Sequence, residues 1–508
     1  MNTNLTDTNK DYAVYLPSIS SFYTKMLSSV NADPEYIKPE RIPAGFEKGI
    51  DGCDYLKKDG YYNYKWSLYS AGHATLDTDK SDIAEAMVQK RNKEDTWILG
   101  DSGGFQIGKG VINFDWERFY ETPSDAKYVG EADRMRMKIL NWLEHTADAS
   151  MVLDIPAWAA APVNTERTGL KSFKDCLDGT LFNNDFFERN AQGKTAFLNV
   201  LQGGNEHEAD IWYDAVKKYS KTFCRGYAMG GQNMRDMHLA LRRIITLRDE
   251  GLLEPGQDVI HFLGTGKLDW SVILTAIQRN IRKHVNPNML VTLDAASPFL
   301  TVVKGQLYTQ HTHRNDKFAY VMESAVDDKR LCGSDIPLPW NSPIADRLTM
   351  GDINYMGPGM LNKLGKEGKT AWDSFSYFLL MAHNVYNHIE AVQRANALTD
   401  IATARYQPSH LQWQKVKAGK KIDEFDIHVP RNIIYLVEFI NRLFESETPM
   451  TMLEQAQPLL ADFSGKKSLK TSAAAFDSLF DVAEVEASDE LTQEEAEQAQ
   501  EFLETLDV

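Results

Sequence analysis

Three features that would place this chain in a membrane, outside the cell or on a disulfide framework are missing from its 508 residues. No run of about 18 uncharged apolar residues occurs, so we expect no membrane-spanning helix. The N-terminal end has no basic-then-apolar leader, which argues against secretion. The four cysteines are scattered and form no Cys-x-x-Cys motif, as expected for a protein of the reducing cytoplasm. They are Cys53, Cys176, Cys224 and Cys332.

Basic residues are outnumbered: the formal net charge is −17, which is unusual for a protein that binds nucleic acid. The acidity is concentrated at one end, because no Lys or Arg follows Lys470 while twelve Asp and Glu residues lie between Asp477 and Asp507. Without those twelve, 60 acidic residues face 55 basic ones, a net charge of −5. We therefore expect residues 463–508 to form a linker and an acidic, flexible tail, and a polyanionic substrate is not excluded.

From about residue 91 a pattern repeats, in which a short apolar run ends in a polar or glycine-rich turn and is followed by a helical segment. Repeated strand–helix units of this kind indicate a parallel sheet. The glycines follow several successive runs instead of only the first. The pattern therefore favours an α/β fold of the (β/α)8 TIM-barrel type over an open, doubly wound sheet. The six apolar runs are residues 97–99, 151–153, 197–201, 226–229, 259–263 and 290–293.

The barrel is predicted to span residues 91–395, with helical insertions. Residues 1–90 mix short apolar runs with turn signals and are assigned to an N-terminal segment that leads into the barrel. Residues 396–462 are predicted to form a C-terminal helical extension with a basic loop. Two buried helices are expected from their nearly continuous apolar character, over residues 375–389 and 432–444.

Two carboxylates stand at the ends of expected strands. Asp101 opens the segment Asp-Ser-Gly-Gly-Phe-Gln, whose glycines let a planar ligand approach the backbone and whose Phe105 can stack on it. Asp294 follows the last apolar run. Active sites of barrels lie at the carboxyl ends of the strands, where two carboxylates can divide labour: one attacks an anomeric carbon and the other transfers protons. The alternative for each is an Asp that caps a helix.

Two further polar residues, Asp154 and Gln202, follow the expected strands that lie between these. A carboxylate can accept hydrogen bonds from the ring and exocyclic N–H groups of a purine, and a carboxamide can donate to its carbonyl. The pair Gly230-Gly231 would add backbone N–H groups where no side chain fits. Each feature alone is compatible with an ordinary loop. Together they stand at successive strand ends, which would bring them to the same face of a barrel.

The same segments resemble the signature motifs of the tRNA-guanine transglycosylases, in the same order. Asp294-Ala-Ala-Ser, followed by Gly305-Gln-Leu-Tyr-Thr309, is similar to the archaeal branch around its nucleophile. The resemblance covers residues 95–390. The other motifs are Asp101-Ser-Gly-Gly-Phe-Gln106, Leu201-Gln-Gly-Gly204, Gly226-Tyr-Ala-Met-Gly-Gly231 and Phe262-Leu-Gly-Thr-Gly266.

This resemblance implies that Asp294 is the nucleophile and Asp101 the general acid and base. The implied reaction is ping-pong: Asp294 displaces guanine, and a 7-deazaguanine then attacks the glycosyl-enzyme after losing its N9 proton. Phe105 and Leu263 would lie on the two faces of the base. The other residues that would hold the base are Ser102, Asp154, Gln202, Gly230 and Gly231.

The family also implies a zinc site of three cysteines and a histidine, and here this chain departs from it. Cys332 and His383 match two of the four positions, but the others fall on Ser334 and Pro337, which cannot bind zinc. We therefore expect no cofactor and a lost zinc site. A rebuilt site that uses His311 and His313 is left open.

Relatives with degraded zinc motifs include DNA-modifying enzymes of bacteriophages and bacterial modification islands, which insert bases such as 7-cyano-7-deazaguanine into DNA. The resemblance thus favours DNA over tRNA as the substrate, in the host cytoplasm if the chain is phage-encoded. Base exchange on tRNA, a nucleoside hydrolase, and a non-catalytic base-binding or scaffold subunit are the alternatives. The presence of both carboxylates argues against the scaffold. Candidate phosphate contacts are Lys363, Lys366, Lys369, Lys415, Lys417, Lys420 and Lys421.

Overall fold

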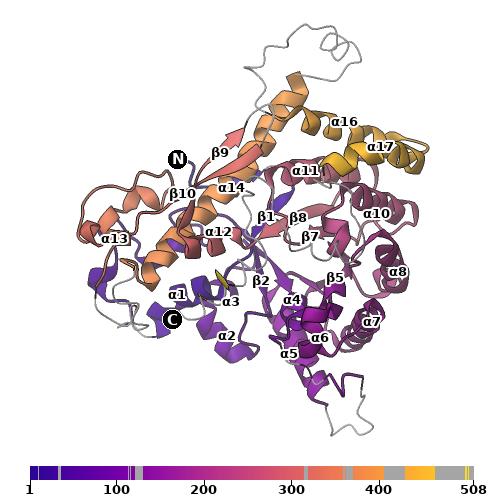
Figure 1. The fold of residues 1–508 in the computed structure, drawn as a ribbon, viewed down its shortest axis with the longest axis horizontal. Coiled ribbons are helices and arrows are strands. Elements are labelled where there is room, and N and C mark those ends of the chain that lie inside the picture. Colours follow the sequence, from indigo (N-terminus) through magenta and orange to yellow (C-terminus); the bar gives the residue numbers. More distant parts are fainter. Residues whose placement is uncertain are drawn as a thin grey trace.

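A computed structural model describes residues 1–9, 11–32, 36–112, 114, 116–120, 130–313, 318–357, 361, 370–405, 429–463, 498–499 and 502. Its centre is a sheet of eight parallel strands in the order β1-β8-β7-β6-β5-β4-β3-β2 (Figure 1). A single bridge between Ser18 and Leu68 joins the two ends of this sheet, with Ile19 N donating to Leu68 O at 3.0 Å. The predicted α/β fold with a (β/α)8 barrel is confirmed.

The strands are short because each only has to cross the barrel wall. They are β1 (Val14–Pro17), β2 (Trp66–Ser70), β3 (Trp97–Asp101), β4 (Ala149–Met151), β5 (Ala196–Leu201), β6 (Gly226–Met229), β7 (Val259–Phe262) and β8 (Leu290–Ala295). Most of their residues are buried, as expected for parallel strands that are covered on both faces. This burial explains why the strands read as continuous apolar runs in the sequence.

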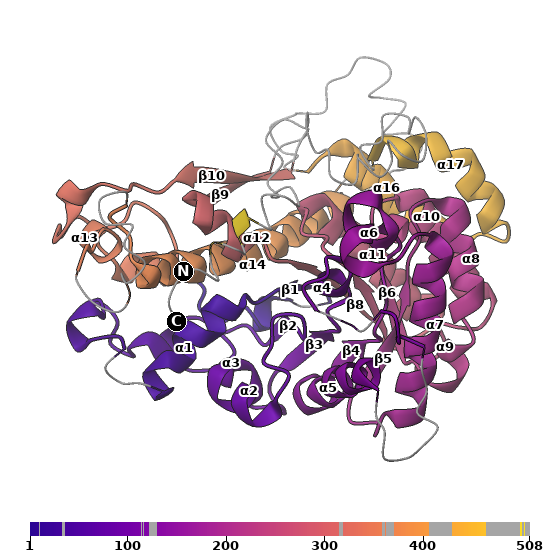
Figure 2. The same ribbon diagram turned by 60° about the horizontal axis from the view of Figure 1, so that its bottom comes forward.

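Helices follow the strands, and most of them cover the outside of the sheet (Figures 1 and 2). After the first four strands these are α1 (Ser21–Ala32), α2 (Thr78–Ala84), α3 (Ala86–Gln89), α4 (Gly104–Gly108), α5 (Glu131–Thr146), α6 (Pro162–Thr168) and α7 (Phe173–Asn190). After β5 to β7 they are α8 (Glu206–Val216), α9 (Tyr219–Thr222), α10 (Met237–Asp249) and α11 (Leu268–His284). Several start at a polar cap; Asn205, for example, accepts a hydrogen bond from Glu208 N.

The N-terminal 90 residues belong to the barrel, because they supply β1 and β2. The predicted boundary at residue 91 therefore runs between two paired strands of one sheet. β1 escapes recognition because it is four residues long and ends at a proline, which cannot donate to the ladder. β4 also differs from its predicted run of 151–153, since it ends at Met151.

The segment after β8 forms an insertion beside the barrel. It contains α12 (Ser297–Leu300), an antiparallel hairpin of β9 (Gln306–His313) and β10 (Phe318–Ser324), α13 (Met350–Ile353) and the long α14 (Ser374–Arg405). α14 is tied to the hairpin where Tyr308 N donates to the Asn384 side-chain oxygen at 2.9 Å. The buried helix expected over residues 375–389 is thus confirmed as part of α14, which continues beyond residue 395.

The C-terminal extension contains two helices: α16 (Arg431–Glu445) and α17 (Pro449–Phe463). α16 confirms the helix expected over residues 432–444. It packs on α11, where Asn280 donates to the Asn441 side-chain oxygen at 2.7 Å. Within the described residues, the search for helices with the length and apolar character needed to cross a membrane finds none. The predicted basic loop and most of the acidic tail lie outside the described residues.

Candidate active site at the mouth of the barrel

The predicted site residues come from successive strand ends at one edge of the barrel. Asp101 is the last residue of β3, and Asp294 is the fifth residue of β8. Asp154 lies three residues after the end of β4, and Gln202 follows β5 directly. Because all eight strands are parallel, these carboxyl ends surround a single opening.

Asp101 is partly buried and is held by neutral donors. Ser70 Oγ donates to Asp101 Oδ2 at 2.5 Å, and the backbone N–H of Gly103 donates to the same carboxylate. Burial raises the pKa of Asp101, the negative charge of Asp294 raises it further, and the donors act in the opposite direction. Gly103 has a φ of 83°, and a Cβ there would lie 2.9 Å from Gly72 N, so glycine is required for the turn into α4.

Asp294 is 7 % exposed, and its two polar contacts fall on one oxygen. Gly264 N donates to Asp294 Oδ1 at 2.6 Å. His261 Nε2 lies 3.3 Å from the same Oδ1, while His261 Nδ1 is 2.9 Å from Thr292 Oγ1. Among the described residues, no hydrogen bond or ion pair reaches Oδ2. The carboxylate is therefore oriented through Oδ1, and Oδ2 is available for other chemistry.

Asp154 and Gln202 form a buried pair. Gln202 Nε2 donates to Asp154 Oδ2 at 2.8 Å, and both side chains are almost fully buried. Burial raises the pKa of Asp154 to about 7, against the lowering effect of the Gln202 hydrogen bond. Gln202 Oε1 is buried without a hydrogen-bond partner in the structure. An acceptor left unsatisfied in this way is costly, so a ligand that donates to it would be favoured.

Glycines around this pair leave the space that side chains would fill. A Cβ at Gly104 would lie 2.6 Å from Asp154 Oδ1, and one at Gly230 would lie 2.8 Å from Gln202 Nε2. Gly230 N itself donates to Leu201 O at 2.8 Å, so this N–H is engaged within the protein and is not free for a base. Gly231 has a φ of 53°, and a Cβ there would lie 2.4 Å from Gly203 O.

The remaining predicted base-binding residues differ in exposure. Phe105 is 40 % exposed, and its ring centroid lies 5.3 Å from that of Trp158 at an angle of 58°. Ser102 is fully buried, and its hydroxyl donates to Val152 O at 3.0 Å. Leu263 is partly buried and directly precedes Gly264, which contacts the Asp294 carboxylate.

Three polar residues of the site were not predicted: Ser70, His73 and His261. Ser70 ends β2 and His73 follows it, and this is a strand that the sequence pattern left unassigned. His73 Nε2 lies 3.0 Å from Gln106 Nε2, and burial lowers the pKa of His73 while Asp101 raises it. His261 had a readable signal, since it is a polar residue inside the apolar run Val-Ile-His-Phe and is fully buried.

The residues at the family's zinc positions do not fit a four-ligand site. His383 is buried with Nδ1 2.8 Å from Ser342 Oγ and Nε2 3.0 Å from Tyr308 O, so both ring nitrogens are engaged. Cys332 is exposed, and its Sγ lies 3.0 Å from Tyr355 O.

The structure describes only some of the alternative zinc ligands and none of the predicted phosphate contacts. His311 Nε2 lies 3.4 Å from Glu390 Oε2, and the side chain of His313 is outside the described part. Within the described ranges, no group of three or more His, Cys, Asp or Glu residues could hold a metal ion. The lysines predicted to contact phosphates all lie outside the described residues: Lys363, Lys366, Lys369, Lys415, Lys417, Lys420 and Lys421.

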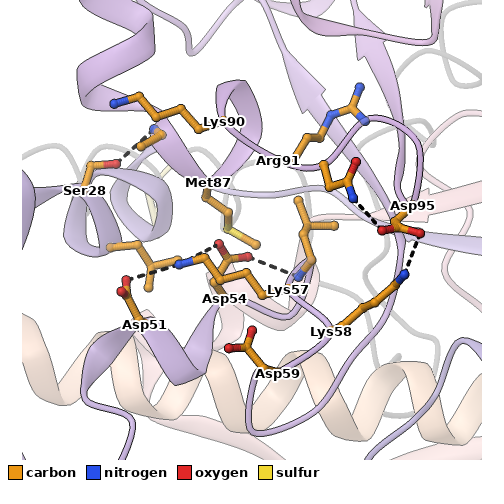
Figure 3. A pocket seen from close by; sticks show the side chains of 14 residues that line it. Ser28, Asp51, Asp54, Lys57, Lys58, Asp59, Met87, Lys90, Arg91 and Asp95 are labelled. Carbon is orange, nitrogen blue, oxygen red and sulfur yellow. Dashed lines mark hydrogen bonds and ion pairs between the residues drawn. The ribbon is translucent and has the colours of Figure 1, made fainter.

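A cavity of about 400 Å³ lies at the other edge of the barrel, among segments that precede β2 and β3 (Figure 3). Lys57 Nζ is 3.4 Å from Asp51 Oδ1 and 3.8 Å from Asp54 Oδ2. Lys58 Nζ is 2.6 Å from Asp95 Oδ1. None of the predicted site residues lines this cavity, and three of its four aspartates, Asp51, Asp54 and Asp95, pair with lysines.

Comparison with models of known protein families and with curated proteins gives no match to this chain.

Proposed function

We propose that this protein replaces guanine in DNA with a 7-deazaguanine, such as 7-cyano-7-deazaguanine, through a covalent glycosyl ester on Asp294. The observation that carries the proposal is the pairing of two differently held carboxylates, Asp101 and Asp294, at the ends of β3 and β8 around one opening. The two are close enough for the charge of Asp294 to contribute to the raised pKa of Asp101.

In the first half-reaction, Asp294 Oδ2 attacks C1′ of the target deoxyguanosine. A C1′–O bond forms, the C1′–N9 bond breaks, and the proton that neutralises N9 of the departing guanine comes from Asp101. The hydrogen bond from Gly264 N holds Oδ1, so Oδ2 is the attacking atom. A raised pKa suits Asp101 to deliver this proton.

In the second half-reaction, Asp101 accepts the N9 proton of the incoming 7-deazaguanine. N9 then attacks C1′, the C1′–O bond to Asp294 breaks, and both carboxyl groups return to their starting states. The incoming base is held by Asp154, which accepts from its ring and exocyclic N–H groups. Because Gln202 Nε2 donates to Asp154 Oδ2, Gln202 would contact the base as an acceptor through Oε1, and not as the donor that the sequence indicated.

The residues at the zinc positions are the reason for preferring DNA to tRNA. The residues at the zinc positions do not form the site that tRNA-modifying relatives imply, because His383 is satisfied by Ser342 and Tyr308. A deoxyribose lacks the electron-withdrawing 2′-OH, so its oxocarbenium-like transition state is easier to reach, which is compatible with DNA but does not decide between DNA and tRNA. In either substrate the guanosine must leave the base stack before Asp294 can reach C1′.

The test is transfer of radiolabelled guanine or 7-cyano-7-deazaguanine to duplex DNA, single-stranded DNA and bulk tRNA, offered in parallel. We expect label in DNA and an SDS-stable protein–DNA adduct, both lost in Asp294→Asn. This variant keeps an oxygen to accept from Gly264 N, and circular dichroism checks its fold. Label in tRNA alone would overturn the choice of DNA, and label in none of the three would overturn base exchange.

A further inference from the structure

We propose that an exposed apolar and basic surface next to the mouth binds the DNA strand that flanks the target nucleotide. This surface, called the α4–α6 surface below, consists of Lys109, Val111, Trp158, Val163 and Arg167. The proposal rests on the proposed function, because it takes DNA as the substrate of the site.

These residues form one continuous surface although they come from three segments. A Cβ at Gly108 would lie 2.7 Å from the Trp158 ring, so the end of α4 packs on η4 (Ala157–Ala160). Lys109 Nζ lies 5.6 Å from the Trp158 ring centroid, and Arg167 donates to Lys109 O at 3.4 Å. Val163 and Arg167 are one helical turn apart on α6, so they share a face.

The surface is continuous with the candidate active site. α4 begins at Gly104, three residues after Asp101, and α4 and α6 lie side by side in both views (Figures 1 and 2). The Phe105 ring, predicted to stack on the base, contacts Trp158 with centroids 5.3 Å apart. A strand whose base enters the site would therefore cross Trp158 as it leaves the mouth.

Two valine side chains of this surface are largely exposed to solvent. Val111 is 69 % exposed and lies two residues after Lys109, and Val163 is 76 % exposed and lies one helical turn before Arg167. Arg167 is exposed and, within the described residues, makes a hydrogen bond to a backbone carbonyl and no ion pair. Glu166 precedes Arg167 in α6 and lies three residues after Val163, so this acid adjoins the α6 part of the surface.

A DNA strand fits this combination better than a folded protein partner does. When the target nucleotide is flipped out, its neighbours lose a stacking partner and expose their bases. Aromatic and aliphatic side chains can take up those base faces, while Lys109 and Arg167 can contact phosphates. The surface also lies beside the site where the flipped nucleotide would react, which is where such a strand has to pass.

The experiment measures binding of the full-length protein to a fluorescein-labelled single-stranded deoxyoligonucleotide by anisotropy, over a range of salt concentrations. We expect Trp158→Ala to weaken binding by about 5- to 150-fold, and Trp158→Phe to restore most of the affinity. Lys109→Ala/Arg167→Ala should reduce the slope of log affinity against log salt by about 0.7 for each phosphate that is no longer neutralised. The matched control is Arg189→Ala/Lys194→Ala, which removes two exposed cations at the opposite edge, before β5.

Each result separates the surface from the chemistry. If both variants bind DNA like the control while wild-type protein transfers label to DNA, the α4–α6 surface is overturned and the proposed function stands. If the variants lose affinity as expected but wild-type protein transfers no label, the surface stands and the proposed function fails. If the variants lost affinity for an RNA oligonucleotide but not for DNA, the assignment of the surface to DNA would be overturned. Wild-type protein that binds neither would overturn the surface.

Discussion

The carboxylates at the two edges of the barrel differ in the groups that hold them. At the mouth, a hydroxyl, an amide and a backbone N–H hold Asp101, Asp154 and Asp294. Within the described residues, none of these three carboxylates forms an ion pair with Lys or Arg. His261 Nε2 lies 3.3 Å from Asp294 Oδ1. Around the cavity at the other edge, Lys57 pairs with Asp51 and Asp54, and Lys58 pairs with Asp95 (Figure 3).

A raised pKa alone does not distinguish the two edges. Burial raises the pKa of Asp54, beside the cavity, to about 7 although Lys57 lowers it, and burial raises the pKa of Asp154, at the mouth, to the same value. Burial is the common cause, and the partner is the difference. The charge of a carboxylate that pairs with a lysine is already neutralised within the protein. A carboxylate held by neutral donors can still interact electrostatically with a substrate, which supports placing the chemistry at the mouth.

The largest effect that tests this comparison is expected from Asp101→Asn. The variant keeps an oxygen for Ser70 Oγ but cannot transfer a proton, so single-turnover base exchange should slow by about 10²- to 10⁴-fold. Quenched-flow measurement of guanine release on DNA gives the rate. Asp95→Asn, at the lysine-paired edge, is the matched control and should exchange at the wild-type rate. Equal rates in both variants would remove Asp101 from proton transfer.

A smaller effect is expected from Asp154→Asn, because it removes a binding group and leaves both reacting carboxylates. The amide offers one weaker acceptor, so affinity for 7-cyano-7-deazaguanine should fall by about 10- to 100-fold, as measured by titration calorimetry at pH 8. In wild-type protein the same affinity should fall about tenfold per pH unit below pH 7, because protonation of Asp154 removes its charge. A pH-independent affinity in wild-type protein would contradict this role.

The same variant should have the opposite effect on stability. The folded-state pKa of Asp154 is raised from 3.8 to about 7, so its contribution to stability is complete below pH 3.8 and is lost as pH rises through 7. Asparagine does not ionise, so Asp154→Asn should raise Tm relative to wild-type protein at pH 8 and much less at pH 5. Loss of ligand affinity together with gain of stability would show that the buried charge serves binding.

The sequence pattern predicted the carboxylates at the mouth of the barrel, but it did not predict the first two strands of the barrel. Asp101, Asp154 and Asp294 could be found because each follows an apolar run. Ser70 and His73 could not, because serines interrupt the apolar residues of β2 and this strand lies where no rhythm was recognised. His261 could have been found as a polar residue in a strand buried on both faces.

Contacts between elements could not be predicted, because they depend on packing. The engagement of Gly230 N by Leu201 O follows from how the chain leaves β6, and a glycine pair in a sequence does not reveal it. Trp158 meets Phe105 only because η4 packs against α4, although the two residues are distant in the chain. The engagement of both His383 nitrogens likewise depends on Ser342 and Tyr308, which come from separate segments.

The smallest effect is expected from Asp54→Asn, and it is the sharpest check on the comparison. Asp54 is buried like Asp154 and has a pKa raised to about 7, so its loss should also raise Tm at pH 8, by roughly 1–3 °C because Lys57 already offsets part of the burial cost. Base exchange and ligand affinity should stay within about twofold of wild-type values, since a distant site is not expected to couple to the mouth. Differential scanning fluorimetry at pH 5 and pH 8, beside the exchange assay, measures both. If Asp54→Asn impaired exchange as Asp154→Asn should, the lysine-paired edge would take part in function, and pairing with a cation would no longer separate the structural from the functional carboxylates.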